Sequence, residues 1–100
     1  MGNIDKMNSI ERLKAAHKHS IRHRKEVTSS KYCGCFYCGY IFPPVEISHW
    51  IDKNEKAIGQ TALCPKCSID SVLGDKSGFS ISEVFLAEMN KYWFNGDSLK

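Results

Sequence analysis

The hydrophobic pattern of the chain begins with a thin apolar stripe, made of Ile10, Leu13, Ala16, Ile21 and Val27. This spacing predicts a helix over residues 8–26, with Asn8 as its cap and Glu11 completing a capping box. Most other positions of this segment carry Lys, Arg or His. Such a helix is typical either of a solvated element docked by one narrow face or of an element that follows a phosphate backbone.

The middle of the chain alternates between apolar and polar positions over residues 45–51, which predicts a strand. We expect His49 on the apolar face of this strand and Trp50 on the other face. A polar loop leads to a short return strand over residues 60–63, so that the two strands form a hairpin. A helix is then predicted over residues 65–73, because its first residue is a proline, which suits the first turn of a helix.

The last predicted element is an amphipathic helix that starts at Ser80 or Ser82 and stops at Asn95-Gly96. Starting at Ser80 would allow a capping box with Glu83. The apolar residues at helical spacing are Ile81, Val84, Phe85, Met89 and Tyr92. We interpret this stripe as core packing and not as a cofactor site.

Four of the five cysteines form two Cys-x-x-Cys pairs, Cys35/Cys38 and Cys64/Cys67. Each pair offers two thiols to one tetrahedral ion, and two pairs complete the four-sulfur shell of a structural Zn²⁺ site. Gly39 can adopt the left-handed conformation that ends a knuckle turn. A disulfide or a redox Cys-x-x-Cys does not explain two matched pairs in a chain without an apolar leader. We therefore expect a cytoplasmic, zinc-binding protein that does not enter a membrane.

The basic residues are concentrated at the start of the chain. The formal net charge is +3 overall, but it divides into +5 for residues 1–31 and −2 for residues 32–100. The sequence thus predicts a basic helix and linker joined to a zinc module within one compact domain. A nucleic acid is one possible partner of the basic helix, and a protein that contacts exposed aromatics such as Trp50 is another. The residues expected to contact phosphates are Lys14, Lys18, Arg22 and Lys25.

The predicted order of a knuckle, a hairpin and a helix bearing the second cysteine pair is that of an α+β fold. It resembles a treble-clef zinc finger, and more narrowly the zinc-bearing branch of the HNH endonuclease family. The residues that carry the resemblance are Cys35, Cys38, Gly39, Glu46-Ile47-Ser48-His49, Asn54 and Leu63-Cys64-Pro65-Lys66-Cys67. A zinc ribbon, with both pairs in knuckle turns, is the competing fold; the residues after Cys67 fit a helix better.

The resemblance implies that His49 acts as a general base on water while a second divalent ion stabilises the phosphate. The chain departs from the family pattern at Ser48, where the family has an acidic residue, and at Ser68, where it has His or Asn. Neither serine is a good ligand for such an ion, so we expect no active nuclease. Two other roles remain open for His49, namely a core histidine bonded to backbone and a zinc ligand.

Three functions therefore remain open for the chain. The first is a non-catalytic interaction module, and the second is an HNH-type endonuclease. The third is a thiol or zinc redox sensor that uses Cys33 and Cys35, and it ranks last because zinc-bound thiolates are poor redox nucleophiles. Cys33 is otherwise a free thiol or an alternative ligand. The segment from Cys35 to Asp75 also resembles small bacterial cytoplasmic zinc proteins, and the oligomeric state stays open.

Overall fold

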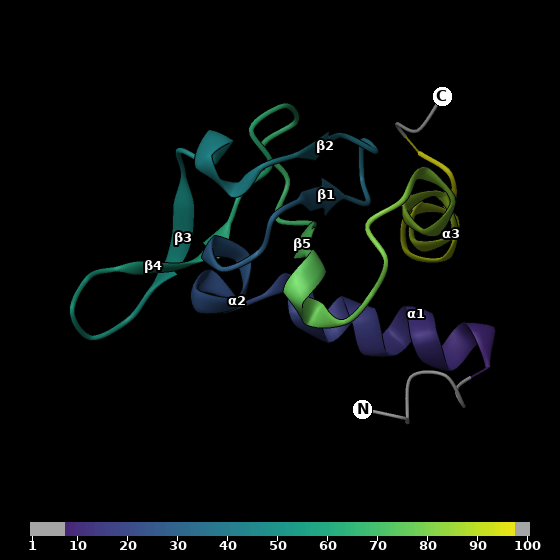
Figure 1. The fold of residues 1–100 in the computed structure, drawn as a ribbon, viewed down its shortest axis with the longest axis horizontal. Helices are drawn as coiled ribbons and strands as arrows, with labels where there is room; N and C mark the ends of the chain where they lie inside the picture. The colour runs from purple at the N-terminus through teal and green to yellow at the C-terminus, as the bar shows by residue number, and fades with distance from the viewer. Residues whose placement is uncertain (1–7, 98–100) are drawn as a thin grey trace.

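Residues 8–97, which the computed structural model describes, form helices around two small antiparallel sheets (Figure 1). The predicted α+β class is therefore confirmed. The ends of the predicted two-part division, residues 1–7 and 98–100, lie outside this range. The regular elements are α1 (Ser9–His17), α2 (Arg24–Thr28), β1 (Cys33–Cys35), β2 (Ile41–Phe42), β3 (Trp50–Lys53), β4 (Gly59–Ala62), β5 (Val72–Gly74) and α3 (Glu83–Phe94). Short 3₁₀ turns cover Lys18–Ser20, Pro44–Glu46 and Asp75–Ser77.

The amino-terminal helix begins as predicted but ends early. The Asn8 side chain accepts the Glu11 N–H at 2.8 Å, and Glu11 accepts the Asn8 N–H at 3.1 Å, which confirms the capping box. The single helix predicted over residues 8–26 is wrong, because the chain bends between α1 and α2. At this bend Arg22 has a φ of 51°, a left-handed conformation that interrupts a helix.

The central sheet has the strand order β2-β1-β5, with all neighbours antiparallel. In this register Cys33 faces Phe42 on one side and Gly74 on the other, while Cys35 faces Val72. The helix predicted over residues 65–73 is wrong, because this segment forms a turn and then enters β5. Pairing with β1 buries β5 completely. This tertiary pairing overrides the local preference of residues 65–73 for a helix.

The second sheet is the predicted hairpin, made of β3 and β4. Its first strand begins at Trp50 rather than at residue 45, because Pro44 starts a 3₁₀ turn just before it. His49 precedes the strand and is exposed, so its predicted place on a buried face is wrong. The hairpin and α3 lie at opposite ends of the molecule, with the central sheet between them (Figure 1).

Helix α3 starts at the second of the two predicted serines and ends where predicted. Ser82 accepts the Phe85 N–H at 3.2 Å, and Asn95 closes the helix with a φ of 59°. The buried face differs in part from the predicted stripe, since Val84 is 72% exposed while Leu86 is fully buried. Helix α3 turns this face towards α1 and the central sheet. None of the helices within residues 8–97 is long and apolar enough to cross a bilayer.

Two hydrophobic clusters hold these elements together. The first joins α1, α3 and one side of the central sheet, and its buried members are Leu13, Ala16, Phe36, Leu73, Phe79, Phe85, Leu86 and Met89. The second surrounds the cysteine pairs, and its buried members are Val27, Cys33, Cys35, Phe42, Ala62, Cys64 and Val72. Because α2 contributes Val27 to the second cluster, the basic segment is packed against the cysteine module.

Candidate metal centre

The first cysteine pair spans the last residue of β1, Cys35, and the turn that follows this strand. The Gly39 N–H donates to the Cys35 carbonyl at 2.8 Å, and the Cys35 N–H donates to the Tyr40 carbonyl at 2.9 Å. The Tyr37 N–H lies 3.4 Å from the Cys35 Sγ and donates to it. Gly39 has a φ of 84°, so the predicted knuckle with its left-handed glycine is confirmed.

The second pair repeats the same hydrogen-bond pattern. The Ser68 N–H donates to the Cys64 carbonyl at 2.9 Å, and the Cys64 N–H donates to the Ile69 carbonyl at 3.0 Å. The Lys66 N–H donates to the Cys64 Sγ at 3.3 Å. Ser68 takes the place of the glycine with a φ of 67°. The predicted helical position of Cys64 and Cys67 is therefore wrong, since a right-handed helix does not include this left-handed residue.

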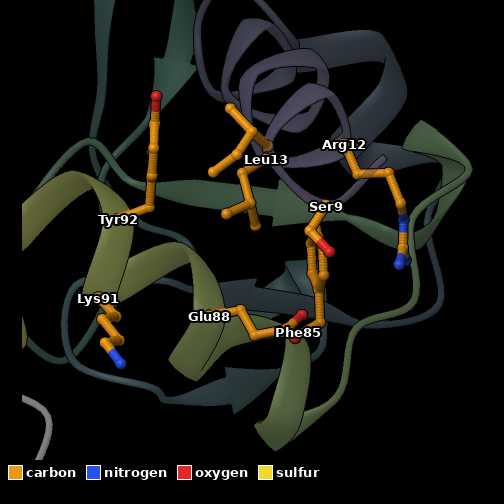
Figure 2. Close-up of a pocket in the computed structure, with 8 residues that line it drawn as sticks. Ser9, Arg12, Leu13, Phe85, Glu88, Lys91 and Tyr92 are labelled. Carbon is orange, nitrogen blue, oxygen red and sulfur yellow. The ribbon is translucent and has the colours of Figure 1, made fainter. Parts of the chain in front are cut away.

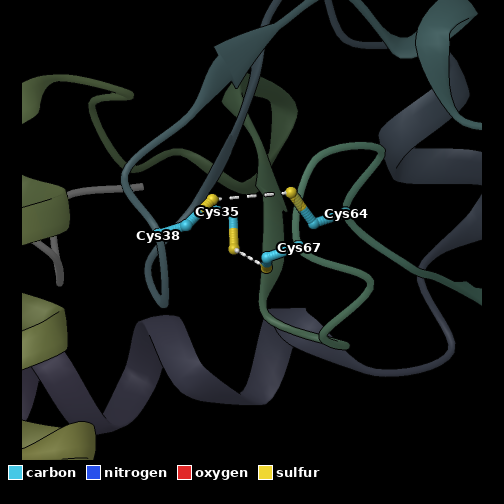
Figure 3. Close-up of side chains that lie close together, drawn as sticks. All are labelled: Cys35, Cys38, Cys64 and Cys67. Carbon is cyan, nitrogen blue, oxygen red and sulfur yellow. Dashed lines mark hydrogen bonds between the residues drawn. The ribbon is translucent and has the colours of Figure 1, made fainter. Parts of the chain in front are cut away.

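The two knuckles bring four sulfur atoms together from segments that are far apart in sequence (Figure 3). All four Sγ atoms lie within 4.8 Å of one another. Two contacts join the knuckles, with 3.6 Å between the Sγ atoms of Cys35 and Cys67 and 3.7 Å between those of Cys38 and Cys64. Tetrahedral zinc–sulfur bonds of about 2.3 Å place neighbouring sulfurs about 3.8 Å apart. The four predicted ligands can therefore hold a metal ion, and their number and type suit zinc.

The surroundings of these thiols affect their protonation in different directions. Burial raises the pKa of Cys35, and it raises the pKa of Cys67 to about 11. Burial alone would also raise the pKa of Cys64, but hydrogen bonds from the amides of Cys67 and Lys66 help to hold that pKa below its usual range. Amides that donate to sulfur stabilise a thiolate, which is the form that binds a metal. Binding of a metal ion would therefore displace protons from the thiols of this cluster whose pKa is raised.

Cys33 and His49 are not members of the four-sulfur group. Cys33 is fully buried in β1, where burial first and the nearby Asp75 second raise the pKa of its thiol to about 12. The exposed His49 has its Nδ1 2.9 Å from the Ser48 Oγ. Within residues 8–97, the four cysteines form the one cluster of three or more His, Cys, Asp or Glu side chains suited to a metal.

Two polar residues that follow His49 in the hairpin, Asp52 and Asn54, have structural hydrogen bonds. Asn54, which carried part of the family resemblance, accepts the N–H groups of Lys56 and Ile58 within its own loop. Asp52 accepts the Thr61 hydroxyl at 2.6 Å. Both side chains therefore stabilise the hairpin, and the general-base role of His49 stays a prediction.

The four basic residues singled out in the sequence are all exposed, but they do not share one surface. Lys18, Arg22 and Lys25 line a groove of ≈ 570 Å³ at the bend between α1 and α2, whereas Lys14 does not line it. Two further basic residues that the sequence analysis did not single out, Arg24 and Lys76, also line the groove. Lys76 follows β5, and no local signal could have placed it there.

Trp50 is less available to a partner than the sequence suggested. The Arg24 guanidinium lies 4.4 Å from the centre of its ring, and the side chain packs against the second cluster. This packing leaves Trp50 half-buried, so its expected exposure is wrong. Tyr32, which is 57% exposed, and Tyr92, which is 39% exposed, are the more accessible aromatic side chains.

A second, apolar groove of ≈ 460 Å³ lies between α1 and α3 (Figure 2). Leu13 and Phe85 line it together with the exposed side chains of Ile10 and Tyr92. Arg12 also lines the groove, with its guanidinium 5.7 Å from the centre of the Phe85 ring. The groove shares no lining residue with the four-sulfur group, so it is separate from the metal centre.

Neither a protein-family model, nor a curated protein, nor a solved structure matches this chain. The interpretation of the metal centre therefore rests on its own geometry and chemistry.

Proposed function

We propose that this chain is a zinc-binding interaction module in which the ion has a structural role. The observation that carries the proposal is the set of four Sγ atoms within 4.8 Å, presented by two knuckles with matching hydrogen bonds. Four thiolates fill a tetrahedral shell and leave no open position for a substrate, as in structural zinc sites. The ion therefore stabilises the fold, and binding to a partner takes place on the surrounding surface.

The position of the cysteines explains how zinc stabilises the protein. The first knuckle follows the central strand β1, and the second joins β4 to β5. An ion held by both knuckles therefore cross-links the middle of the sheet to the end of the hairpin. A chain of 100 residues buries a small core, and a metal cross-link adds stability that this core lacks.

The two matching knuckles support a zinc-ribbon-like centre in preference to the treble clef, in which a helix carries the second pair. The proposed relation to HNH-like zinc proteins rests on the knuckle residues and on the hairpin between them. Cytoplasmic location remains part of the proposal, since paired cysteines hold metal in a reducing compartment.

An HNH-type endonuclease is the second candidate, and the exposure of His49 favours it because a general base must reach its substrate. The serines at positions 48 and 68 still argue against a catalytic ion. An active nuclease should nick plasmid DNA when Mg²⁺ or Mn²⁺ is added and lose this activity in His49→Ala. A thiol sensor has less support, because Cys33 is buried and its pKa is raised.

Elemental analysis of protein purified without added metal tests the main proposal. We expect about one zinc per chain in the wild type and in His49→Ala, and loss of zinc in Cys38→Ser. Cys33→Ala is the matched control, because it removes a cysteine that lies outside the four-sulfur group and should keep the zinc. A wild-type protein without metal, or loss of zinc in His49→Ala, would contradict the proposal.

A further inference from the structure

We propose that the groove at the bend between α1 and α2 binds the phosphodiester backbone of a nucleic acid. The inference rests on the proposed interaction function and names the partner of that module. The basic groove, as we call it, has a volume of ≈ 570 Å³. Its basic lining residues are Lys18, Arg22, Arg24, Lys25 and Lys76.

The charges of the basic groove are not balanced by acidic side chains. Glu26 is the one carboxylate in the lining, and both of its oxygens lie 3.0 Å from the Nδ1 of His19. Within residues 8–97, no lysine or arginine side chain lies within ion-pair distance of a carboxylate. The five lysine and arginine side chains of the groove therefore lack a carboxylate partner. A concave surface lined by charges of one sign concentrates the field and attracts an opposite charge.

The fold fixes the backbone of the groove before any ligand binds. The Arg22 N–H donates to the Thr61 Oγ1 at 2.8 Å, which attaches the bend to β4. On the other side, the Lys76 N–H donates to the Ser30 Oγ at 3.1 Å and attaches the turn after β5 to the end of α2. These two bonds hold the bend and α2, strand β4 and the turn after β5 together in one surface, although the three segments are distant in sequence. A surface organised in advance binds with a smaller entropic cost.

Arg24 has a different role from the other basic residues of the groove. Its Nη1 donates to the Gly59 carbonyl at 2.7 Å, and its guanidinium covers the Trp50 ring at 4.4 Å. Arg24 therefore attaches α2 to the hairpin and adds charge to the groove wall. The exposed side chains of Lys18, Arg22, Lys25 and Lys76 are the ones available to contact a ligand.

The chemistry of the lining favours a nucleic-acid backbone over other anions. Several cations along one groove suit a ligand with regularly repeated charges, whereas a flat lipid surface does not enter a groove. Ser29 and Gln60 add a hydroxyl and an amide, which are common phosphate donors beside lysine and arginine. Tyr, Trp and Phe, the side chains on which bases usually stack, are absent from the groove lining. We therefore expect binding that depends on salt and little on sequence.

The test compares two variants that remove the same number of charges. The groove variant is Lys18→Gln/Lys25→Gln/Lys76→Gln, and the matched control is Lys53→Gln/Lys56→Gln/Lys91→Gln. All six lysines are exposed, and the control lysines do not line the groove. Binding to a labelled DNA duplex and to a single-stranded RNA is measured by fluorescence anisotropy at several salt concentrations, with sodium polyglutamate as a competing acidic polymer.

We expect the wild type and the control to bind, with an affinity that falls steeply as the salt concentration rises. The groove variant should lose at least about tenfold in affinity, and its slope of log K against log salt on duplex DNA should be smaller by about 2 to 3. Preference for the duplex or for the RNA identifies which nucleic acid fits the groove. Lys76→Gln alone should weaken binding more than Lys14→Gln, because Lys76 lines the groove.

Three results would overturn the inference. Equal losses in both triple variants would show that only net charge matters. Competition by polyglutamate as strong as that by unlabelled DNA would indicate an acidic protein partner. A zinc-loaded wild type that binds neither oligonucleotide at low salt would contradict nucleic-acid binding by the basic groove, but not the proposed zinc module. A wild type without zinc would instead contradict the proposed function itself.

Discussion

His23 is a buried side chain whose two ring nitrogens both form hydrogen bonds. Its Nδ1 lies 2.6 Å from the His19 carbonyl, so this nitrogen carries the proton and donates it. Its Nε2 accepts the Ala62 N–H at 3.0 Å. Only the neutral ring with its proton on Nδ1 satisfies both bonds. His23 thereby attaches the bend between α1 and α2 to β4, next to the second knuckle.

The stability of the protein should therefore depend on the protonation of His23. Burial holds the pKa of His23 below its ordinary value of 6.5, although the His19 carbonyl and Glu26 act in the opposite direction. The unfolded chain then binds more protons than the folded chain, so the free energy of unfolding falls as the pH drops through about 6.5. We expect this dependence in urea unfolding of the zinc-loaded protein between about pH 5.5 and 7.5.

The control for this measurement is a second histidine variant. His23→Gln should lower stability at pH 7.5 and remove the part of the pH dependence that His23 causes. His49→Gln, at an exposed position, should leave stability and its pH dependence nearly unchanged. An identical pH profile in wild type and His23→Gln would contradict the assigned protonation state.

At the scale of elements, the β3–β4 hairpin depends on a glycine at the start of its second strand. A Cβ added at Gly59 would lie 2.6 Å from the Trp50 Cβ and 2.7 Å from the Trp50 carbonyl oxygen. The backbone of β3 must move to relieve such a contact, so Gly59→Ala should lower the free energy of unfolding by about 1–3 kcal/mol. Thermal unfolding followed by circular dichroism measures this change.

Ala57, in the loop of the same hairpin, allows the reverse substitution, from alanine to glycine. It has a φ of 64°, a conformation that glycine adopts without a steric penalty. Ala57→Gly should therefore keep or slightly raise the stability. A loss as large as that of Gly59→Ala would show that the loop, and not the contact with Trp50, limits the hairpin.

The elements that the sequence predicted correctly have local signals. The Asn8–Glu11 capping box, the serine cap of α3 and its end at Asn95 each depend on residues within a few positions of one another. The first knuckle likewise contains its own signal in Gly39. The four paired cysteines were also predicted correctly as members of one group. Each Cys-x-x-Cys pair is a local motif, so its role as a pair of ligands could be recognised from sequence.

The elements that the sequence missed are determined by contacts between distant segments. Ser68 occupies the left-handed position of the second knuckle, and serine gives no signal for this conformation. β5 exists because it pairs with β1, nearly forty residues earlier in the printed sequence. Lys76 reaches the basic groove for the same reason, since this pairing sets the course of the turn that carries it.

At the scale of the whole molecule, the metal centre should determine whether the second cluster stays ordered. Cys35 and Cys64 are both buried members of this cluster and belong to different knuckles. Removing the ion with a chelator should lower Tm by at least about 10 °C, because structural zinc contributes several kcal/mol and each kcal/mol shifts Tm by about 4–8 °C in a domain of this size. Added Zn²⁺ should restore the transition, whereas added Mg²⁺ should not.

The positions of the five cysteines also allow the unfolding of the protein to be followed by the reactivity of its own thiols. With the ion bound, four thiols are occupied as ligands, and Cys33 is buried with 0% exposure. A coloured thiol reagent should therefore react slowly with the loaded protein. After chelation, a rapid reaction of the four knuckle thiols followed by a slow reaction of Cys33 would mean that the metal-free chain keeps its central strand covered. If all five thiols react together, loss of the ion and global unfolding are a single event. The number of thiols that react in each phase thus shows whether the fold persists after the ion is removed, and the measurement needs no attached label.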